Sequence, residues 1–223
     1  MNFITKIIGY SALNIPLFSF EWGLPNHPTV LILGGVHGNE IEGVTLARHL
    51  QAEFLKSFTF NLHVILVPEL NPDGVLLKTR GNGNSVDLNR NLPTKDWSSE
   101  FSETKYNPGP SPMSEPENKA LIQLIEQNNI KFIFSLHSWH PLINPNGPCE
   151  EVASILSQRT GYKIEPDMGY PTPGCLGTFA FREKNIPTIT YELERGLSPA
   201  KIPNPHTQAF IESLKLLEEQ FSK

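Results

Sequence analysis

Short apolar runs rich in β-branched residues alternate with helical patterns along this chain of 223 residues, and this alternation limits the fold more than any other feature. The strand-like runs span residues 30–36, 61–67, 131–137 and 188–193, with weaker runs at 4–8 and 17–22. Helical spacing is seen over residues 41–56, 115–129, 151–160 and 206–221, and Ser114 is expected to be the N-cap of the second of these helices. Strands that alternate with helices at these lengths are typical of an α/β protein with a mainly parallel, helix-covered sheet.

Composition narrows the class of protein further. Hydrophobic residues make up 39% of the chain and charged residues 18%, which indicates one globular domain over residues 1–223. The net charge is -5 and the 18 basic residues are scattered, so we expect no nucleic-acid partner. Residues 1–18 match neither a signal peptide nor a membrane span. Cys149 and Cys175 are too few for a disulfide framework, although they allow one bridge, and a cytoplasmic protein with free thiols is the expectation.

Residues 93–116 interrupt the alternation. This stretch is rich in Pro, Ser, Gly and Asn and is too long for an ordinary connection. We interpret it as a loop that borders the active site, and a tolerated surface insertion is the alternative.

Two of the strand-like runs end in a histidine. Residues 31–40 read LILGGVHGNE, an apolar strand followed by a glycine-flanked turn that carries His37 and Glu40 and leads into a helix. Residues 132–137 form another apolar strand, which ends in His137. Because open α/β sheets bind ligands at the carboxyl ends of their strands, these three side chains are candidates for one site.

Two imidazoles and one carboxylate, with a position left for water, form a known catalytic zinc set. Each piece alone is weak, since His-x-x-Glu is common by chance and a histidine at a strand end is more often structural. The cluster of Gly34, Gly35 and Gly38 hints at phosphate binding, but the full dinucleotide-binding order is absent.

Beyond these residues, the chain carries several motifs in a fixed order. They are GGVHGNE at 34–40, PELNPDG at 68–74, Arg80, VDLNRNLP at 86–93, SEPE at 114–117, FSLHSW at 134–139 and PGCLGTFAFREKNIPTITYELERG at 173–196. With these motifs the chain resembles the zinc carboxypeptidase family, and within it the small bacterial murein peptide amidases, which cleave γ-D-glutamyl–meso-diaminopimelate bonds. The resemblance covers residues 30–196 and implies a three-layer α/β/α domain with a mixed, mostly parallel central sheet.

The resemblance also implies a role for each matching residue. It makes His37, Glu40 and His137 the ligands of one Zn²⁺ per chain. It makes Glu192 the general base and Arg80 the oxyanion-stabilising arginine. Asn89 and Arg90 then grip the carboxylate of a small peptide substrate, and Asp87 and residues 71–74 support the site.

Structural roles remain open for several of these residues. Glu194 lies two residues after Glu192 in a strand pattern, so either can face the site, and the family motif selects Glu192. Arg80 can be a surface arginine on a loop rich in Gly and Asn, and residues 89–90 can cap the structure after a strand. The family's tyrosine near the leaving amine has no clear motif, which leaves Tyr170 or Tyr191 as candidates. Among the other histidines, His140 is the one nearest to the expected ligands in sequence.

Three functions fit these features. The first is a murein peptide amidase or carboxypeptidase that hydrolyses an amide next to a terminal carboxylate. The second is a deacylase of N-acyl amino acids, similar to succinylglutamate desuccinylase and aspartoacylase, which share the His-x-x-Glu and Asp-Leu-Asn-Arg motifs. The third is a zinc-binding module without catalysis, which the presence of Glu192 disfavours.

Overall fold

One eight-stranded mixed sheet organises the molecule. The computed structural model describes residues 2–222. The strands are β1 (Phe3–Tyr10), β2 (Pro16–Trp22), β3 (Thr29–Leu33), β4 (His63–Val67), β5 (Ile130–Trp139), β6 (Leu142–Asn146), β7 (Lys163–Ile164) and β8 (Thr188–Glu194). Their order in the sheet is β1-β2-β4-β3-β5-β8-β6-β7. The four neighbours β4, β3, β5 and β8 are mutually parallel, while β1, β2 and β6 add antiparallel pairs.

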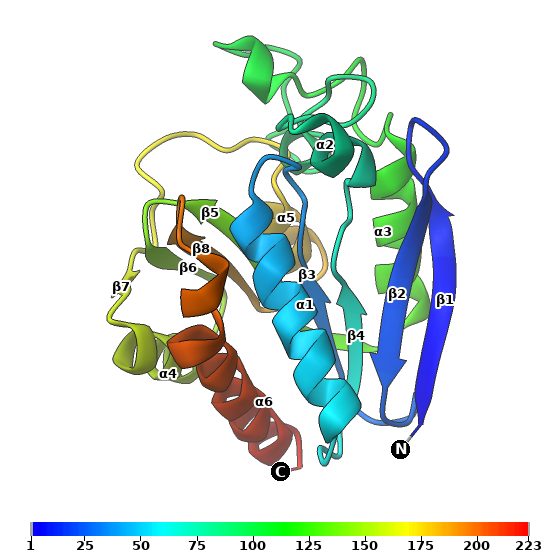
Figure 1. Cartoon of the computed structure of the whole chain (residues 1–223). Coiled ribbons are helices and arrows are strands. Elements are labelled where there is room, and N and C mark those ends of the chain that lie inside the picture. The colour runs from blue at the N-terminus through cyan, green and yellow to red at the C-terminus, as the bar shows by residue number, and fades with distance from the viewer. Residues whose placement is uncertain (1, 223) are drawn as a thin grey trace.

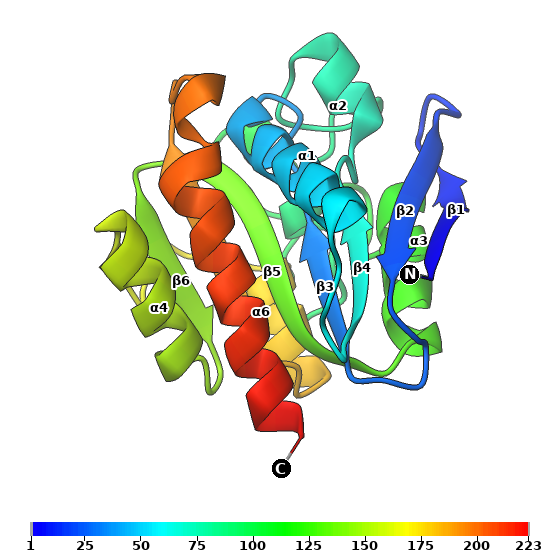
Figure 2. The ribbon, with the colours of Figure 1, turned by 60° about the horizontal axis from the view of Figure 1, so that its bottom comes forward.

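Helices cover both faces of this sheet, which gives three layers (Figures 1 and 2). The longer helices are α1 (Ile41–Lys56), α3 (Pro116–Gln127), α4 (Glu150–Thr160) and α6 (Gln208–Phe221), and the short ones are α2 (Pro72–Leu77) and α5 (Leu176–Thr178). One core lies between the sheet and α1, α4 and α6, and a second lies between the sheet and α3 and α5. The expected three-layer α/β fold is confirmed.

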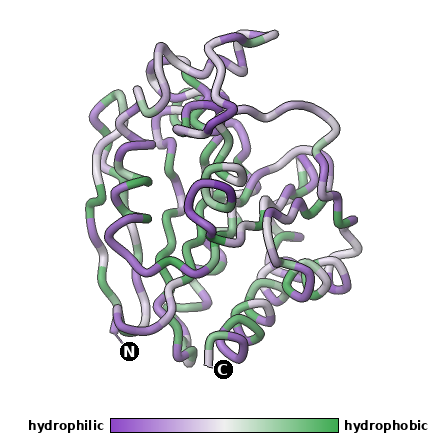
Figure 3. The backbone as a smooth tube through the Cα atoms, turned by 180° about the vertical axis from the view of Figure 1, so that it is seen from behind, coloured by the Kyte–Doolittle hydropathy of each residue, from purple (hydrophilic) through white to green (hydrophobic). Residues whose placement is uncertain are grey.

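The central strands are apolar because helices cover both of their faces. All five residues of β3 and all five of β4 are buried. Figure 3 shows the same strands as largely hydrophobic stretches in the middle of the molecule. Since β3, β5 and β8 run in the same direction, the residues that follow β3 and those at the carboxyl ends of β5 and β8 meet at one edge of the sheet.

The sequence patterns located most elements, with some differences at the ends. The strand expected over residues 30–36 ends earlier, at Leu33, because Gly35 has a positive φ and turns the chain. The helix expected from residue 206 begins at Gln208 after a short irregular helical turn, η5 (Pro203–Thr207). Strands β6 and β7 and helix α2 are not evident from the periodicity.

The prediction that Ser114 caps α3 is wrong. The N-cap of α3 is Glu115, which makes no side-chain cap hydrogen bond, and the Ser114 hydroxyl instead donates to the Glu115 carboxylate at 2.6 Å. Pro116 at the first helical position needs no acceptor for an amide hydrogen, so the helix begins without a side-chain cap.

Cys149 and Cys175 are both free, so the bridge that the sequence allowed is not formed. Among residues 2–222 no helix is both long enough and apolar enough to cross a membrane.

Candidate active site

The turn after β3 places His37 and Glu40 at the edge of the sheet. Gly38 in this turn lies so close to helix α2 that a Cβ added there would be 1.8 Å from the carbonyl carbon of Gly74. The side chain of Asn71 caps α2 by accepting from the Gly74 amide at 2.8 Å, and it also donates to the main-chain oxygen of Val36. Residues 71–74 therefore hold the turn that presents His37, in agreement with the support expected of them.

His37, Glu40 and His137 come together as a buried group that can hold a metal ion. Nδ1 of His37 lies 3.1 Å from Nδ1 of His137. The Glu40 carboxylate lies 3.0 Å from His37 Nδ1 through one oxygen and 2.9 Å from His137 Nδ1 through the other. His37 and Glu40 approach from the turn after β3, and His137 comes from β5.

The Nε2 atoms of both imidazoles are hydrogen-bonded, and these bonds leave the Nδ1 atoms available to bind a cation. Nε2 of His37 lies 2.9 Å from Asp87, whose carboxylate can only accept, so the proton of neutral His37 is on Nε2 and its Nδ1 carries a lone pair. Nε2 of His137 lies 3.0 Å from the Ser135 hydroxyl, which permits the same arrangement. Two nitrogen lone pairs and a carboxylate then converge on one point, which is the donor set of a catalytic zinc site.

Asp87 links this group to Arg80. The carboxylate of Asp87 accepts from Arg80 Nε at 2.8 Å through the oxygen that His37 leaves free, and Arg80 Nη1 lies 3.3 Å from Glu40. Burial would raise the pKa of Asp87, but His37 and Arg80 hold it far below its usual range. Burial likewise opposes the charge of Glu40, yet the two histidines keep its pKa well below the ordinary value. Both carboxylates are therefore ionised at neutral pH.

Glu192 lies beside His137 in the sheet, since the two residues are paired in register between β8 and β5. It is 7% exposed, and among residues 2–222 its Oε2 has no hydrogen-bond partner. Burial raises the pKa of Glu192 to about 7, with His137 opposing this shift and Glu40 adding to it. Glu194, the alternative from sequence, is exposed and does not line the cavity. Geometry and motif therefore both favour Glu192.

A cavity of about 700 Å³ opens onto these side chains. Arg80, Asn89 and Arg90 line it together with His37, Glu40, His137 and Glu192, so the structure brings all seven residues expected from sequence to one place. The side-chain oxygen of Asn89 accepts from the Leu176 amide at 2.8 Å, and its NH₂ group bonds no acceptor within the part of the chain that the structure describes. Arg90 is 5% exposed and donates one hydrogen bond to the main-chain oxygen of Asn89.

Comparison with known proteins identifies the family. Residues 6–154 match the family model described as "Zinc carboxypeptidase". The chain belongs to the zinc carboxypeptidase family.

The similar proteins include several amidases. Murein peptide amidase A of Vibrio campbellii is 35% identical over 223 residues, which covers 93% of this chain and 86% of that protein. Murein peptide amidase A of Escherichia coli (strain K12) is 34% identical, over 84% of this chain and 80% of that protein. The crystal structure of murein-tripeptide amidase from Escherichia coli O157 matches with a TM-score of 0.77 and 30% identity, over 96% of this chain and 91% of that one.

The match to the zinc carboxypeptidase model ends before Glu192. The matched range thus includes the positions of the expected metal ligands, Arg80, Asn89 and Arg90, whereas the assignment of Glu192 relies on its sequence motif and its position in the cavity. Bovine thrombin-activatable fibrinolysis inhibitor, at 19% identity and a TM-score of 0.82, shows the same fold.

In this zinc carboxypeptidase Tyr106 is a site residue that sequence reasoning missed. Its ring lies 5.3 Å from the guanidinium carbon of Arg80 and 5.4 Å from that of Arg90. Tyr106 and Lys105 line the cavity and belong to the stretch 93–116. The interpretation of this stretch as a loop bordering the site is therefore confirmed. The loop was the only signal for Tyr106, because nothing in its local sequence marks this tyrosine.

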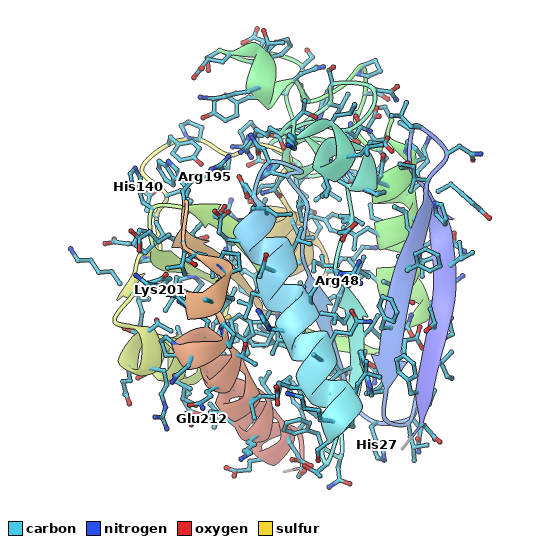
Figure 4. The ribbon with its side chains drawn as sticks, in the orientation of Figure 1. His27, Arg48, His140, Arg195, Lys201 and Glu212 are labelled. Carbon is cyan, nitrogen blue, oxygen red and sulfur yellow. The ribbon has the colours of Figure 1, made fainter. Side chains whose placement is uncertain are left out.

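The two tyrosines proposed from sequence are placed very differently. Tyr170 is 37% exposed and lines the cavity. Tyr191 is fully buried on the opposite face of β8 and bonds His206 at 2.6 Å, so it does not reach the site. His140 is exposed beside Trp139 and does not line the cavity (Figure 4).

Proposed function

We propose that this chain is a murein peptide amidase that hydrolyses the γ-D-glutamyl–meso-diaminopimelate bond, with one zinc ion held by His37, Glu40 and His137. The observation that supports it best is the shared cavity, in which the buried metal-binding group, Glu192 and the paired donors of Asn89 and Arg90 face the same space. The relatives that match over most of their length bear the name murein peptide amidase.

Each of these residues has a separate role in the proposed hydrolysis of the amide. Zinc, when bound, supplies a Lewis acid and lowers the pKa of water. Glu192 takes the proton that the attacking water loses and passes it to the leaving nitrogen, and a carboxyl with a pKa of about 7 can do both near neutral pH. Arg80, fixed by Asp87, faces the developing negative charge on the carbonyl oxygen.

Arg90 and Asn89 hold the carboxylate of the residue that leaves. A guanidinium is charged at any physiological pH and its planar fork matches a carboxylate. Arg90 donates one hydrogen bond to the main-chain oxygen of Asn89, which fixes the orientation of the guanidinium group. Its other N–H groups remain available to the substrate carboxylate. This clamp requires a free carboxylate next to the scissile amide, as the proposed substrate has.

The test compares purified, zinc-loaded protein on L-Ala-γ-D-Glu-meso-diaminopimelate and on a panel of N-acyl amino acids that includes N-succinylglutamate and N-acetylaspartate. We expect release of diaminopimelate from the tripeptide and no turnover of the N-acyl amino acids. Turnover of an N-acyl amino acid without release of diaminopimelate would establish the deacylase alternative. An Arg90→Gln variant serves as a control for the clamp, because it should raise KM for the tripeptide while retaining bound zinc.

We also propose a cytoplasmic location and a part in the recycling of cell-wall peptides. The free thiols of Cys149 and Cys175 support a reducing compartment. Fractionation of cells that express the tagged protein tests the location.

A further inference from the structure

Basic side chains outnumber acidic ones around the cavity. Five basic residues line it, against three acidic ones: Arg80, Arg90, Lys105, Arg182 and Arg195 against Glu40, Asp167 and Glu192. Four of the five basic groups have partners. Arg80 bonds Asp87, Arg90 and Arg195 bond main-chain oxygens, and Lys105 pairs with Glu103. Arg182 makes no side-chain hydrogen bond or ion pair with any of residues 2–222, so its guanidinium is free to bind an anion.

A short helical segment holds Arg182 at the cavity wall. Helix α5 continues directly into the turn η3 (Phe179–Glu183), and together they span residues 176–183. Leu176, Phe179 and Ala180 of this segment are buried in the second core. Gly177, Thr178 and Arg182 face the cavity instead. Since Thr178 and Arg182 are four residues apart, they lie above one another on the same helical face. The side chain of Arg182 is therefore exposed at the cavity, while the buried residues of the same segment hold its backbone in place.

The adjoining wall supplies a hydrogen-bond acceptor. Asn144 and Asn146 of β6 line the cavity, and Asn144 is paired in register with Thr190, two residues from Glu192. Asn146 donates to the side-chain oxygen of Asn144 at 3.0 Å, and Asn144 donates to the main-chain oxygen of Glu165 at 2.8 Å. This chain of hydrogen bonds fixes both amides, and no donor among residues 2–222 bonds Oδ1 of Asn146.

The absence of a side chain at Gly177 leaves room for the amide group of Asn146. A Cβ added at Gly177 would lie 2.7 Å from Nδ2 and 3.2 Å from Oδ1 of Asn146, so any larger residue would displace the amide. The amide of Asn146 therefore lies directly against the segment that carries Arg182. An acceptor for an ammonium group and a donor fork for a carboxylate are found on adjoining walls of one cavity.

We propose that Arg182 and Asn146 recognise the far end of the leaving residue's side chain, which must carry both an amino group and a carboxylate. Arg182 binds the distal carboxylate and Asn146 Oδ1 accepts from the adjacent ammonium group, while Arg90 and Asn89 hold the carboxylate next to the scissile amide. The inference deepens the proposed function and rests on it, because meso-diaminopimelate has two such amino-acid ends joined by methylene groups. Lysine has the same ammonium group but no distal carboxylate, so it leaves Arg182 without an anion.

The test compares two tripeptides that differ only in this carboxylate, L-Ala-γ-D-Glu-meso-diaminopimelate and L-Ala-γ-D-Glu-L-Lys. In an Arg182→Gln variant, kcat/KM for the diaminopimelate peptide should fall by about tenfold to a hundredfold, mostly through KM, since a charge-assisted hydrogen bond is lost. The value for the lysine peptide should change by less than about twofold. Lys184→Gln is the matched control, because it removes one positive charge from the adjoining turn at a side chain that bonds Glu126 and does not line the cavity.

Calorimetric binding of free meso-diaminopimelate and free L-lysine separates this inference from the reaction itself. Wild type should bind diaminopimelate more tightly, and Arg182→Gln should abolish most of that difference. If neither tripeptide is cleaved but this binding preference is found and depends on Arg182, the proposed function fails and the recognition stands. If the ratio of the two kcat/KM values, or the binding preference, is the same in Arg182→Gln as in wild type, the assignment of Arg182 is wrong.

Discussion

Asp87 Oδ1 lies 2.9 Å from Nε2 of His37, on the side of the imidazole that faces away from Glu40 and His137. This carboxylate sets the tautomer of His37, a proposed metal ligand, and through its other oxygen it orients Arg80. One buried residue thus prepares both the metal site and the group proposed to stabilise the oxyanion.

An Asp87→Asn variant should therefore bind zinc about tenfold to a hundredfold more weakly, because the neutral amide no longer fixes the proton on His37 Nε2. Competition with a fluorescent chelator measures the affinity. Glu69→Gln is a control of equal charge change, since Glu69 pairs with Arg48 on a half-exposed surface. Unchanged zinc affinity in Asp87→Asn, with retained thermal stability, would show that the tautomer is set without Asp87.

A Glu192→Gln variant should lose about 10²-fold to 10⁴-fold in kcat, the range usual for general acid–base groups, with little change in KM. The reason is that glutamine cannot carry the proton between water and the leaving nitrogen. Glu194→Gln is the matched control on the same strand, and it should keep the wild-type rate because Glu194 is exposed and outside the cavity. Comparable activity in Glu192→Gln and wild type would remove Glu192 from the mechanism.

Tyr106 should act through its ring. Tyr106→Ala removes contacts to two guanidinium groups, each worth about 0.5–1 kcal/mol at an exposed site. We expect a drop of about fivefold to thirtyfold in kcat/KM. Tyr106→Phe keeps the ring and should stay within about twofold of wild type. A loss in Tyr106→Phe as large as that in Tyr106→Ala would instead assign the role to the hydroxyl group.

His206 should make the free energy of unfolding depend on pH. Burial lowers the pKa of His206 to about 4, below the ordinary value of about 6.5, and its Nδ1 bonds Tyr191. The folded protein therefore binds fewer protons at this residue than the unfolded chain between these two values. The stabilisation is full above about pH 6.5 and is lost as the pH falls toward about 4.

Urea unfolding of zinc-free wild type and His206→Asn at pH 7 and pH 5 measures this effect. All other titrating groups are shared by the two proteins, so their contributions cancel in the difference between the two free energies of unfolding. His206→Asn should be less stable than wild type at pH 7, and the gap should narrow at pH 5. Ser213→Ala, at a buried position of α6 that carries no titrating group, is the control whose gap should stay constant. A constant gap for His206→Asn would contradict the assignment of a neutral, buried His206.

The sequence predicted the proposed metal ligands and the proposed general base better than it predicted the other residues that line the cavity. His37 follows β3 and His137 lies in β5, at runs whose apolar character is visible in the sequence, so their meeting at one sheet edge follows from parallel topology. Glu192 followed from its motif, and the burial of Glu192 and exposure of Glu194 now separate two residues that periodicity left equivalent.

The missed parts depend on contacts between residues far apart in the chain. Strand β6 contains Pro145 and two asparagines, which are poor strand formers, and it is held by pairing with β8 and not by local preference. Tyr106 belongs to a loop, and only the contacts of its ring with the distant Arg80 and Arg90 reveal its place. Ser114 looked like an N-cap because only its residue type was visible, whereas its hydroxyl oxygen accepts from the side-chain amide of Asn91 and its proton goes to Glu115.

The hydrogen bond from the Leu176 amide to Asn89 has a consequence for how this site can change over evolutionary time. A second bond, from the Leu92 amide to the Gly174 carbonyl, ties the same two segments together. An insertion or deletion at residues 174–176 would pull Asn89 away from its place beside Arg90. Point substitutions at Thr178 or Arg182 leave both bonds intact. The family's diversity at this wall should therefore arise from exchanged side chains, while its backbone keeps a constant length.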